Sequence, residues 1–288
     1  MYDVIVIGSG GAGLTAALAA ADTGARVLVL EASSRWGGST AVSAGEVWTP
    51  LNHRMGELGI SDSAEDALRY CLSNASGRCS EVVEAFVHAA PRMARFVEAR
   101  SPIVWRAMHS PDSLAEQSGG RHAGRHLEVA PLAAGDLESM QDNFWLPTFP
   151  AIFTNDEVFK LRLLLGGEWP EALAQKRTRD GYVCNGVGLI VGLMQGCRAL
   201  DVQFERNTRV RRLFCRAGHK VDGVIIERDG EEVVIHANNG VVLASGGFEW
   251  NETWRDSALS GQPTHPVSPP LHFGDGQRLV SDVGGVLA

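Results

Sequence analysis

The stretch DVIVIGSGGAGLTAALAAADTGARVLVLE (residues 3–31) decides the expected fold of this chain. It begins with a short run of β-branched apolar residues, which is typical of a strand buried on both faces of a parallel sheet. From Gly11 onward the residues are strong helix formers, and Gly24 is a typical helix stop. Residues 25–31 form a second apolar run that ends in an acid. The stretch therefore predicts one complete strand–helix–strand unit.

Three glycines lie between the first predicted strand and the helix. Gly8, Gly10 and Gly13 form the pattern G-x-G-x-x-G. In such a unit the first glycine permits a tight turn, the second lets the backbone approach a pyrophosphate, and the third lets the helix pack closely on the strands. The helix N-terminus, with Gly11 and Ala12, offers unpaired N–H groups and a partial positive charge to the phosphates. A dinucleotide is the expected ligand.

Glu31 ends the second predicted strand, 18 residues after the last of these glycines. A carboxylate at this point can accept hydrogen bonds from ribose hydroxyls, and it would repel a 2′-phosphate. The spacing therefore favours a ligand with an adenosine half and disfavours NADP.

The residues after Glu31 favour FAD over NAD. A second glycine pair, Gly37–Gly38, is followed by the hydroxyls of Ser39 and Thr40 and then by Ser43, Ala44 and Gly45. Small residues and hydroxyls in series suit a chain that crosses very close to a long ligand and donates hydrogen bonds to its pyrophosphate. An NAD-dependent dehydrogenase, the weaker alternative, has no need of such a crossing.

These residues and several later blocks resemble a known family, the FAD-dependent oxidoreductases that include soluble fumarate reductases and 3-ketosteroid Δ1-dehydrogenases. The blocks follow the family's order across nearly the whole chain. They are GSGGAG (8–13), Glu31, GGSTAVSAG (37–45), NTRV (207–210), GVVLASGGF (240–248) and GDG (274–276).

The resemblance implies a role for each block. The backbone of Val210 would meet the adenine, the strand ending at Ala244, Ser245 and Gly246 would run beside the adenosine, and Asp275 would lie in the flavin site. Ser39 stands where membrane-bound relatives carry the histidine that attaches FAD covalently, so we expect non-covalent FAD. The candidate cofactor residues are Gly8, Gly10, Gly11, Ala12, Gly13, Glu31, Gly38, Ser39, Thr40, Ala44, Gly45, Val210, Ala244, Ser245, Gly246 and Asp275.

The expected fold class is α/β: a doubly wound parallel sheet in a Rossmann-like FAD-binding domain, with a β-meander and a helical insertion. We expect one domain over residues 1–288, with the strand–helix–strand unit and the flavin crossing in 1–50. A largely helical or loop insertion is expected in 51–200. The β-meander, a returning strand and the GDG segment are expected in 201–288. The chain ends soon after GDG, so we expect the family's capping substrate domain to be absent.

Apolar periodicity predicts helices from about residue 60 to 100, interrupted at Pro91, and a glycine-studded helix at 184–200. The segment GGRHAGR (119–125) resembles a loop that borders the active site in the steroid enzymes, with a solvated polar loop as the alternative. His122 and His126 are too few, and too flexibly placed between glycines, to predict a metal site. Trp48 follows the flavin-crossing segment and is a candidate substrate contact.

The resemblance implies hydride exchange between flavin N5 and a C–C bond next to a carbonyl, with a steroid-like enone or an unsaturated acid as substrate and a separate electron acceptor. No catalytic residue can be named. Ser113 and Leu114 stand where the steroid enzymes carry an aromatic residue, and none of the three tyrosines is near them in sequence. The alternative is a catalytically incomplete FAD-binding fragment without turnover of its own.

Composition excludes other classes of function. The net charge of −8, without a basic stripe, argues against a nucleic-acid partner. The most apolar helical segment, residues 12–21, is far shorter than the ~20 residues of a membrane span. No leader pattern precedes the first strand, and the five cysteines are scattered without C-x-x-C spacing. The expected location is the cytoplasm.

Overall fold

The computed structural model describes residues 1–75, 80–135, 140–216, 220–260, 262 and 264–286. Contacts divide the chain into two compact units. Unit 1 consists of Met1–Ser43, Asp136–Phe149 and Ile190–Ala288, and unit 2 consists of Ala44–Gly135 and Pro150–Leu189. The expected single domain with an insertion stays a prediction.

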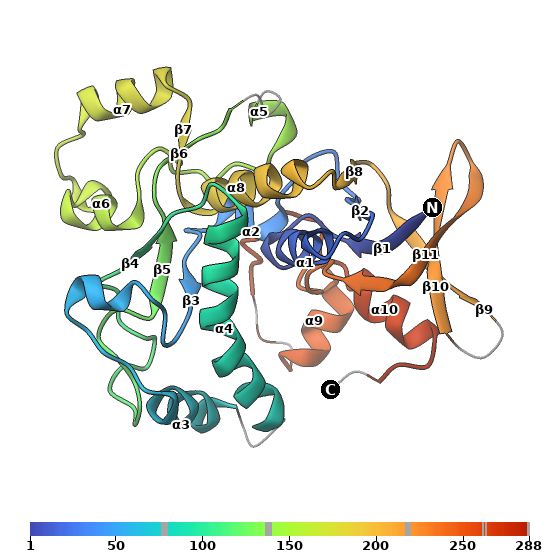
Figure 1. Cartoon of the computed structure of the whole chain (residues 1–288), viewed down its shortest axis with the longest axis horizontal. Helices are drawn as coiled ribbons and strands as arrows, with labels where there is room; N and C mark the ends of the chain where they lie inside the picture. The colour runs from blue at the N-terminus through green and yellow to red at the C-terminus, as the bar shows by residue number, and fades with distance from the viewer. Residues whose placement is uncertain (76–79, 136–139, 217–219, 261, 263, 287–288) are drawn as a thin grey trace. The chain divides into compact units, whose positions relative to one another are not determined.

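Unit 1 is built on a six-stranded sheet with the order β8-β2-β1-β11-β10-β9. The strands are β1 (Tyr2–Ile7), β2 (Val27–Leu30), β8 (Gln203–Glu205), β9 (Val210–Arg216), β10 (Lys220–Arg228) and β11 (Glu231–Leu243). Strands β8, β2, β1 and the end of β11 run parallel, whereas β10 pairs antiparallel with β9 and with the start of β11. Helix α1 (Gly11–Asp22) connects β1 to β2 and packs on both (Figure 1).

The apolar runs of β1 and β2 are buried as their composition predicts. All four residues of β2 are buried, and so are the last three of β1. On one face of the sheet Ile5, Leu28 and Val224 belong to a core cluster that Leu279 of helix α10 (Asp275–Asp282) also joins. The expected α/β fold with a parallel sheet is confirmed.

Strand β11 differs from expectation. The sequence suggests two strands, one in the meander and one returning to the parallel sheet, but residues 231–243 form a single strand. Its first half pairs with β10, and its second half pairs parallel with β1, with Val241 opposite Ile5. The register with β1 shifts between Tyr2 and Val4, next to Gly240, whose φ is +154°. A glycine is permissive at such an irregularity, so one strand serves both partners.

Pro91 does not interrupt its helix, contrary to expectation. Helix α4 runs without a break over Ser80–Arg100 with Pro91 inside it. Val87, Ala90, Ala94 and Val97 form a buried stripe on the helix. Burial of this stripe on both sides of the proline outweighs the lost backbone hydrogen bond, which is how tertiary packing overrides propensity.

The remaining elements divide between the two units. Unit 2 holds the antiparallel sheet β3 (Val47–Trp48), β5 (His126–Val129) and β4 (Trp105–Ala107), the pair β6 (Leu132–Ala133) and β7 (Tyr182–Val183), the helices α3 (Ala64–Asn74), α4, α6 (Asn155–Lys160) and α7 (Glu171–Arg179), and the 3-10 turns η1 (Met55–Leu58) and η2 (Leu163–Leu165). Unit 1 also holds α2 (Gly38–Val42), α5 (Met140–Asn143) and α9 (Glu252–Ala258). The predicted glycine-studded helix is α8 (Asn185–Ala199), whose residues belong to both units.

A fully buried arginine lies at the centre of a cluster of side chains in unit 2. Arg125 ends the segment GGRHAGR and has 0% exposure, so its side chain is not part of a solvated loop. Its guanidinium donates two hydrogen bonds to Asp62, at 2.9 and 2.8 Å, and one to Asp112, at 2.8 Å. It also lies 5.5 Å from the ring centre of Trp48 and 5.6 Å from that of Tyr70.

The candidate substrate contact Trp48 is part of this cluster. Its indole N–H donates to Asp112 at 2.7 Å, and its ring stacks on Tyr70 and Phe86. No tyrosine is near Ser113 and Leu114 in sequence, but the fold places Tyr70 beside Leu114. The hydroxyl of Tyr70 accepts a hydrogen bond from the backbone N–H of Leu114 at 3.4 Å.

Acid should weaken this cluster. Burial by itself raises the pKa of Asp62, but the hydrogen bonds and charge of Arg125 outweigh it and hold the pKa below the usual value. A carboxyl whose folded-state pKa is lowered contributes stability above its unfolded pKa of about 3.9 and loses it as the pH falls through the folded-state value.

We predict that Arg125→Met lowers the free energy of unfolding by about 3–5 kcal/mol at pH 7, because it removes the buried cation that pairs with two buried carboxylates, Asp62 and Asp112. The difference from wild type should narrow near pH 4, where the Asp62 carboxyl, without Arg125, takes up a proton. Urea denaturation at both pH values measures this. The control is Arg69→Met, which removes exposed ion pairs to Glu65 and Asp66 and should cost at most about 1 kcal/mol. Equal losses in the two variants would contradict the prediction.

Candidate functional site

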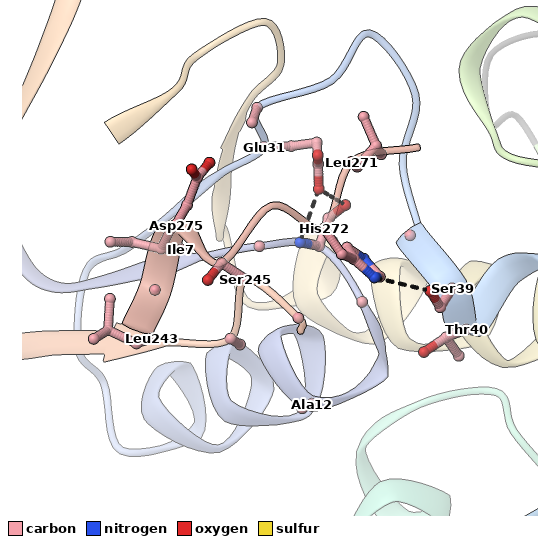
Figure 2. A pocket seen from close by; sticks show the side chains of 18 of the residues that line it. Ile7, Ala12, Glu31, Ser39, Thr40, Leu243, Ser245, Leu271, His272 and Asp275 are labelled. Atoms are coloured by element: carbon pink, nitrogen blue, oxygen red, sulfur yellow. Dashed lines mark hydrogen bonds between the residues drawn. The ribbon is translucent and has the colours of Figure 1, made fainter. Parts of the chain in front are cut away.

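A cavity of about 470 Å³ lies in unit 1 at the carboxyl ends of the parallel strands. Its wall is formed by the turn from β1 into α1, the residues after β2, the start of α2, the end of β11 and the start of α10 (Figure 2). In open α/β sheets this edge is where ligands bind. Its size is that of a small-molecule site.

Two of the three motif glycines in the turn from β1 to α1 have no room for a side chain. Gly8 has φ of +106°, and a Cβ there would lie 2.3 Å from the carbonyl oxygen of Ala244. A Cβ on Gly13 would lie 2.0 Å from the carbonyl oxygen of Gly8. Gly10, the N-cap of α1, makes no side-chain cap bond. The turn therefore presents the positive end of a 12-residue helix to the cavity.

Glu31 is held in place by neutral donors. It is 7% exposed, and its Oε2 accepts hydrogen bonds from the backbone N–H of Ser9 at 3.1 Å and from its hydroxyl at 2.6 Å. Its Oε1 accepts the N–H of Ser33 at 3.0 Å. The hydroxyl of Ser9 also accepts the N–H of Gly37 at 3.0 Å, so it ties the two glycine loops together. Sequence reasoning missed Ser9, although a hydroxyl between two motif glycines is a usable signal.

Twelve of the sixteen candidate cofactor residues line this cavity. They are Gly8, Gly10, Gly11, Ala12, Glu31, Gly38, Ser39, Thr40, Ala244, Ser245, Gly246 and Asp275. Thr40 accepts a hydrogen bond from the N–H of Gly11 at 3.1 Å, so the hydroxyl pair lies at the start of α1.

The other four candidates lie elsewhere. Gly13 is buried behind the turn, and Val210 is 3% exposed within the core cluster. Ala44 and Gly45 belong to unit 2, where the Ala44 carbonyl accepts a bond from Asn155 and Gly45 packs against Asn185. The roles assigned to these residues toward FAD stay predictions.

Asp275 begins α10 and makes ion pairs with Arg209 of the NTRV segment and, at 3.6 Å, with Arg278. Figure 2 draws its side chain on the opposite side of the view from Ser39. Its carboxylate therefore belongs to the part of the cavity nearest the NTRV segment. Its role toward the flavin stays a prediction.

Nine further residues line the cavity and were not predicted. They are Ile7, Ser9, Ala32, Leu243, Leu271, His272, Gly276, Gln277 and Val280. Most of them lie one or two positions from a predicted residue in the sequence. Extending each motif by two residues would therefore have included those. Gln277 is informative because its Oε1 is buried and has no hydrogen-bond partner among the described residues. A buried acceptor without a partner is costly, and a ligand donor would satisfy it.

These features fit a dinucleotide. A glycine turn brings backbone N–H groups to the cavity, a carboxylate lines it, and the amide oxygen of Gln277 lacks a partner among the described residues. A family model described as an FAD binding domain matches residues 3–288. The chain belongs to this FAD-binding family.

Similar proteins agree with this assignment. The chain is 32% identical over 290 residues to the 4-oxocyclohexanecarboxylate 2-dehydrogenase of Sinomonas cyclohexanicum, with 98% of this chain and 50% of the relative covered. It is 31% identical over 303 residues to the 3-oxosteroid 1-dehydrogenase of Comamonas testosteroni, with 96% and 52% covered. The crystal structure of the 3-ketosteroid Δ1-dehydrogenase from Sterolibacterium denitrificans in complex with 1,4-androstadiene-3,17-dione matches with a TM-score of 0.87 and 28% identity, covering 98% of this chain and 55% of that one.

The chain spans about half the length of the curated relatives that it matches. The resemblance drawn from the sequence motifs is confirmed, and so is FAD as the cofactor of the family. In the described part of the FAD-binding chain no helix is long and apolar enough to cross a membrane. The same residues contain no group of three or more potential metal-ligating side chains, and His122 is exposed.

Gly13→Ala should disrupt the cofactor turn. At an ordinary helix position alanine is about 1 kcal/mol better than glycine, but here its Cβ would collide with the Gly8 carbonyl. We expect a loss of about 1–3 kcal/mol in stability and at least about a tenfold loss in FAD affinity, measured by thermal unfolding and by titration with FAD.

Gly24→Ala is the control at the other end of α1: unlike Gly13, Gly24 has positive φ, so alanine there is strained, but a Cβ there would meet nothing within 4 Å. This variant should keep wild-type FAD affinity. A Gly13→Ala protein that binds FAD as tightly as wild type would show that the turn does not hold the cofactor.

Proposed function

We propose that the cavity of unit 1 binds FAD non-covalently and that the chain is the FAD-binding part of an oxidoreductase. The observation that carries the proposal is the convergence of the glycine turn, Glu31 and the Ser39–Thr40 pair on one cavity of an FAD-binding family member. Non-covalent binding is supported by the serine at position 39 and by the absence of histidine before residue 52.

Each part of the cavity has its own task in this proposal. The N-terminus of α1 binds the diphosphate. Glu31 accepts the ribose hydroxyls, and Ser9 keeps its carboxylate turned toward the cavity. The main chain at Ala244 to Gly246 borders the adenosine, since side chains there are small.

The reaction class follows from what the relatives have in common. Both curated names combine an oxo group with a dehydrogenation. Bound FAD supplies a hydride acceptor or donor at N5. We therefore propose hydride exchange at a C–C bond next to a carbonyl, on a small-molecule substrate such as a steroid-like enone or an unsaturated acid. A separate electron acceptor completes the cycle, and the cytoplasm is the proposed location.

A second candidate function is FAD binding without turnover. It is favoured by the share of the relatives that the chain spans, about half of their length. The two candidates predict the same cofactor and differ only in catalysis.

The purified chain, incubated with FAD and desalted, should show the two absorbance bands of protein-bound oxidised flavin. Acid precipitation should release the flavin into the supernatant, because no covalent bond holds it. Flavin that remains in the pellet would contradict non-covalent binding, and a folded protein that retains none would contradict the proposed function.

The same preparation separates the two candidates. The oxidoreductase should reduce an artificial electron acceptor when a 3-ketosteroid or 4-oxocyclohexanecarboxylate is added, and the Gly24→Ala protein should behave alike. Tight FAD binding without substrate-dependent reduction would favour the fragment.

A further inference from the structure

The carboxylate of Glu31 already accepts three hydrogen bonds from the described residues. Its Oε2 accepts the N–H of Ser9 at 3.1 Å and the hydroxyl of Ser9 at 2.6 Å (Figure 2). Its Oε1 accepts the N–H of Ser33 at 3.0 Å. The two oxygens of an ionised carboxylate offer about four acceptor positions in total. Ser9 therefore fills both positions of Oε2, and one position of Oε1 is left.

The direction of the bond from the Ser9 hydroxyl is fixed by its other partner. A hydroxyl has one hydrogen and two lone pairs. The N–H of Gly37 donates to Ser9 Oγ at 3.0 Å, so the hydrogen of this hydroxyl is directed to Glu31. Ser9 is fully buried, with 0% exposure, so bulk water does not compete for either bond. The saturation of Oε2 is thus built into the packed glycine turn.

A ligand in the cavity meets Glu31 through its remaining acceptor position. Glu31 is 7% exposed and belongs to the lining of the cavity. Because Oε2 is saturated, a further donor can add a bond only at Oε1. A hydrogen bond to a buried charged acceptor contributes more than one between neutral groups.

The ribose of an adenosine carries two adjacent donors, the 2′- and 3′-hydroxyls. We propose that Glu31 accepts a hydrogen bond from only one of them, through Oε1, and that Ser9 is the positioning residue that imposes this limit. The inference rests on the proposed FAD binding, and it narrows the contact of Glu31 from the ribose hydroxyls to one hydroxyl.

A second carboxylate in the described lining shapes the test. Asp275 lies at the start of α10, where it makes ion pairs with Arg209 and Arg278. It is another acceptor that a ribose hydroxyl can reach, so removing a hydroxyl from the ligand does not by itself identify the acceptor. The effect of each hydroxyl must therefore be compared between wild type and a variant of Glu31.

Calorimetric titration of the cofactor-free chain with ADP, 2′-deoxy-ADP and 3′-deoxy-ADP at one pH makes this comparison. In wild type, one deoxy analogue should bind at least about tenfold more weakly than ADP, as expected for a lost hydrogen bond to a charged group. Glu31→Gln should reduce that ratio to about threefold or less, because a neutral amide is a weaker acceptor. The ratio for the other analogue should be the same in both proteins.

Ser9→Ala tests the limit itself. This variant keeps the backbone N–H but removes the hydroxyl, so Oε2 regains one acceptor position. The second analogue should then also lose affinity relative to ADP, by about threefold or more. Ser9→Cys, which has a similar volume and a weak donor, gives the same readout if the alanine variant is unstable.

Ser33→Ala is the matched control. The Ser33 hydroxyl bonds only to the backbone of Arg35, at 2.5 and 3.1 Å, whereas its N–H, which the substitution keeps, is the donor to Glu31. This variant should give wild-type ratios for both analogues.

Three results would contradict the proposals in distinguishable ways. If Glu31→Gln reduces the effect of both hydroxyls, Glu31 accepts from both and the limit does not exist. If Ser9→Ala weakens ADP and both analogues by the same factor, Ser9 has only a structural role. A folded wild-type protein that binds neither FAD nor ADP would instead contradict the proposed function.

Discussion

The contact between Gly13 and the carbonyl of Gly8 is the constraint on which unit 1 depends. No Cβ fits between them, so α1 can approach β1 closely enough for its first N–H groups to border the cavity. In this turn the hydroxyl of Ser9 donates a hydrogen bond to Glu31 and accepts one from the N–H of Gly37. The close contact of Gly13 with Gly8, together with the bonds of Ser9, therefore positions helix α1, Glu31 and the loop at Gly37 relative to one another.

Much of this could be predicted from the sequence because the signals are local. The strand–helix–strand unit is encoded in about 30 consecutive residues, and its glycines have requirements that no other residue meets. Motif blocks far apart in sequence, such as Glu31 and Asp275, were also assigned to one site, and they do line one cavity. Neither residue alone indicates that the other is near. The sequence motifs and the family resemblance together assigned both to one site.

The parts that were missed depend on tertiary contacts. Helix α4 continues through Pro91 because a buried stripe holds both halves, and propensity alone cannot weigh that. Arg125 ends a glycine-rich segment that resembles a loop, yet it is buried between Asp62 and Asp112. His272 gave no periodic or motif signal, yet it lines the cavity and its Nδ1 lies 2.6 Å from Oε1 of Glu249. Pairings of this kind become visible when distant segments are placed together.

The pairing of β1 with β11 has a consequence for how the protein is made. Ile5 and Val241 are far apart in sequence, and the cavity lining also includes Val280. The hairpin of β10 and β11 is local and can form early, whereas the parallel partner waits for a long loop to close. The edge of β1 that pairs with β11 therefore stays uncovered until β11 has been synthesised. During that interval the nascent protein has the exposed strand that chaperones recognise and that promotes aggregation.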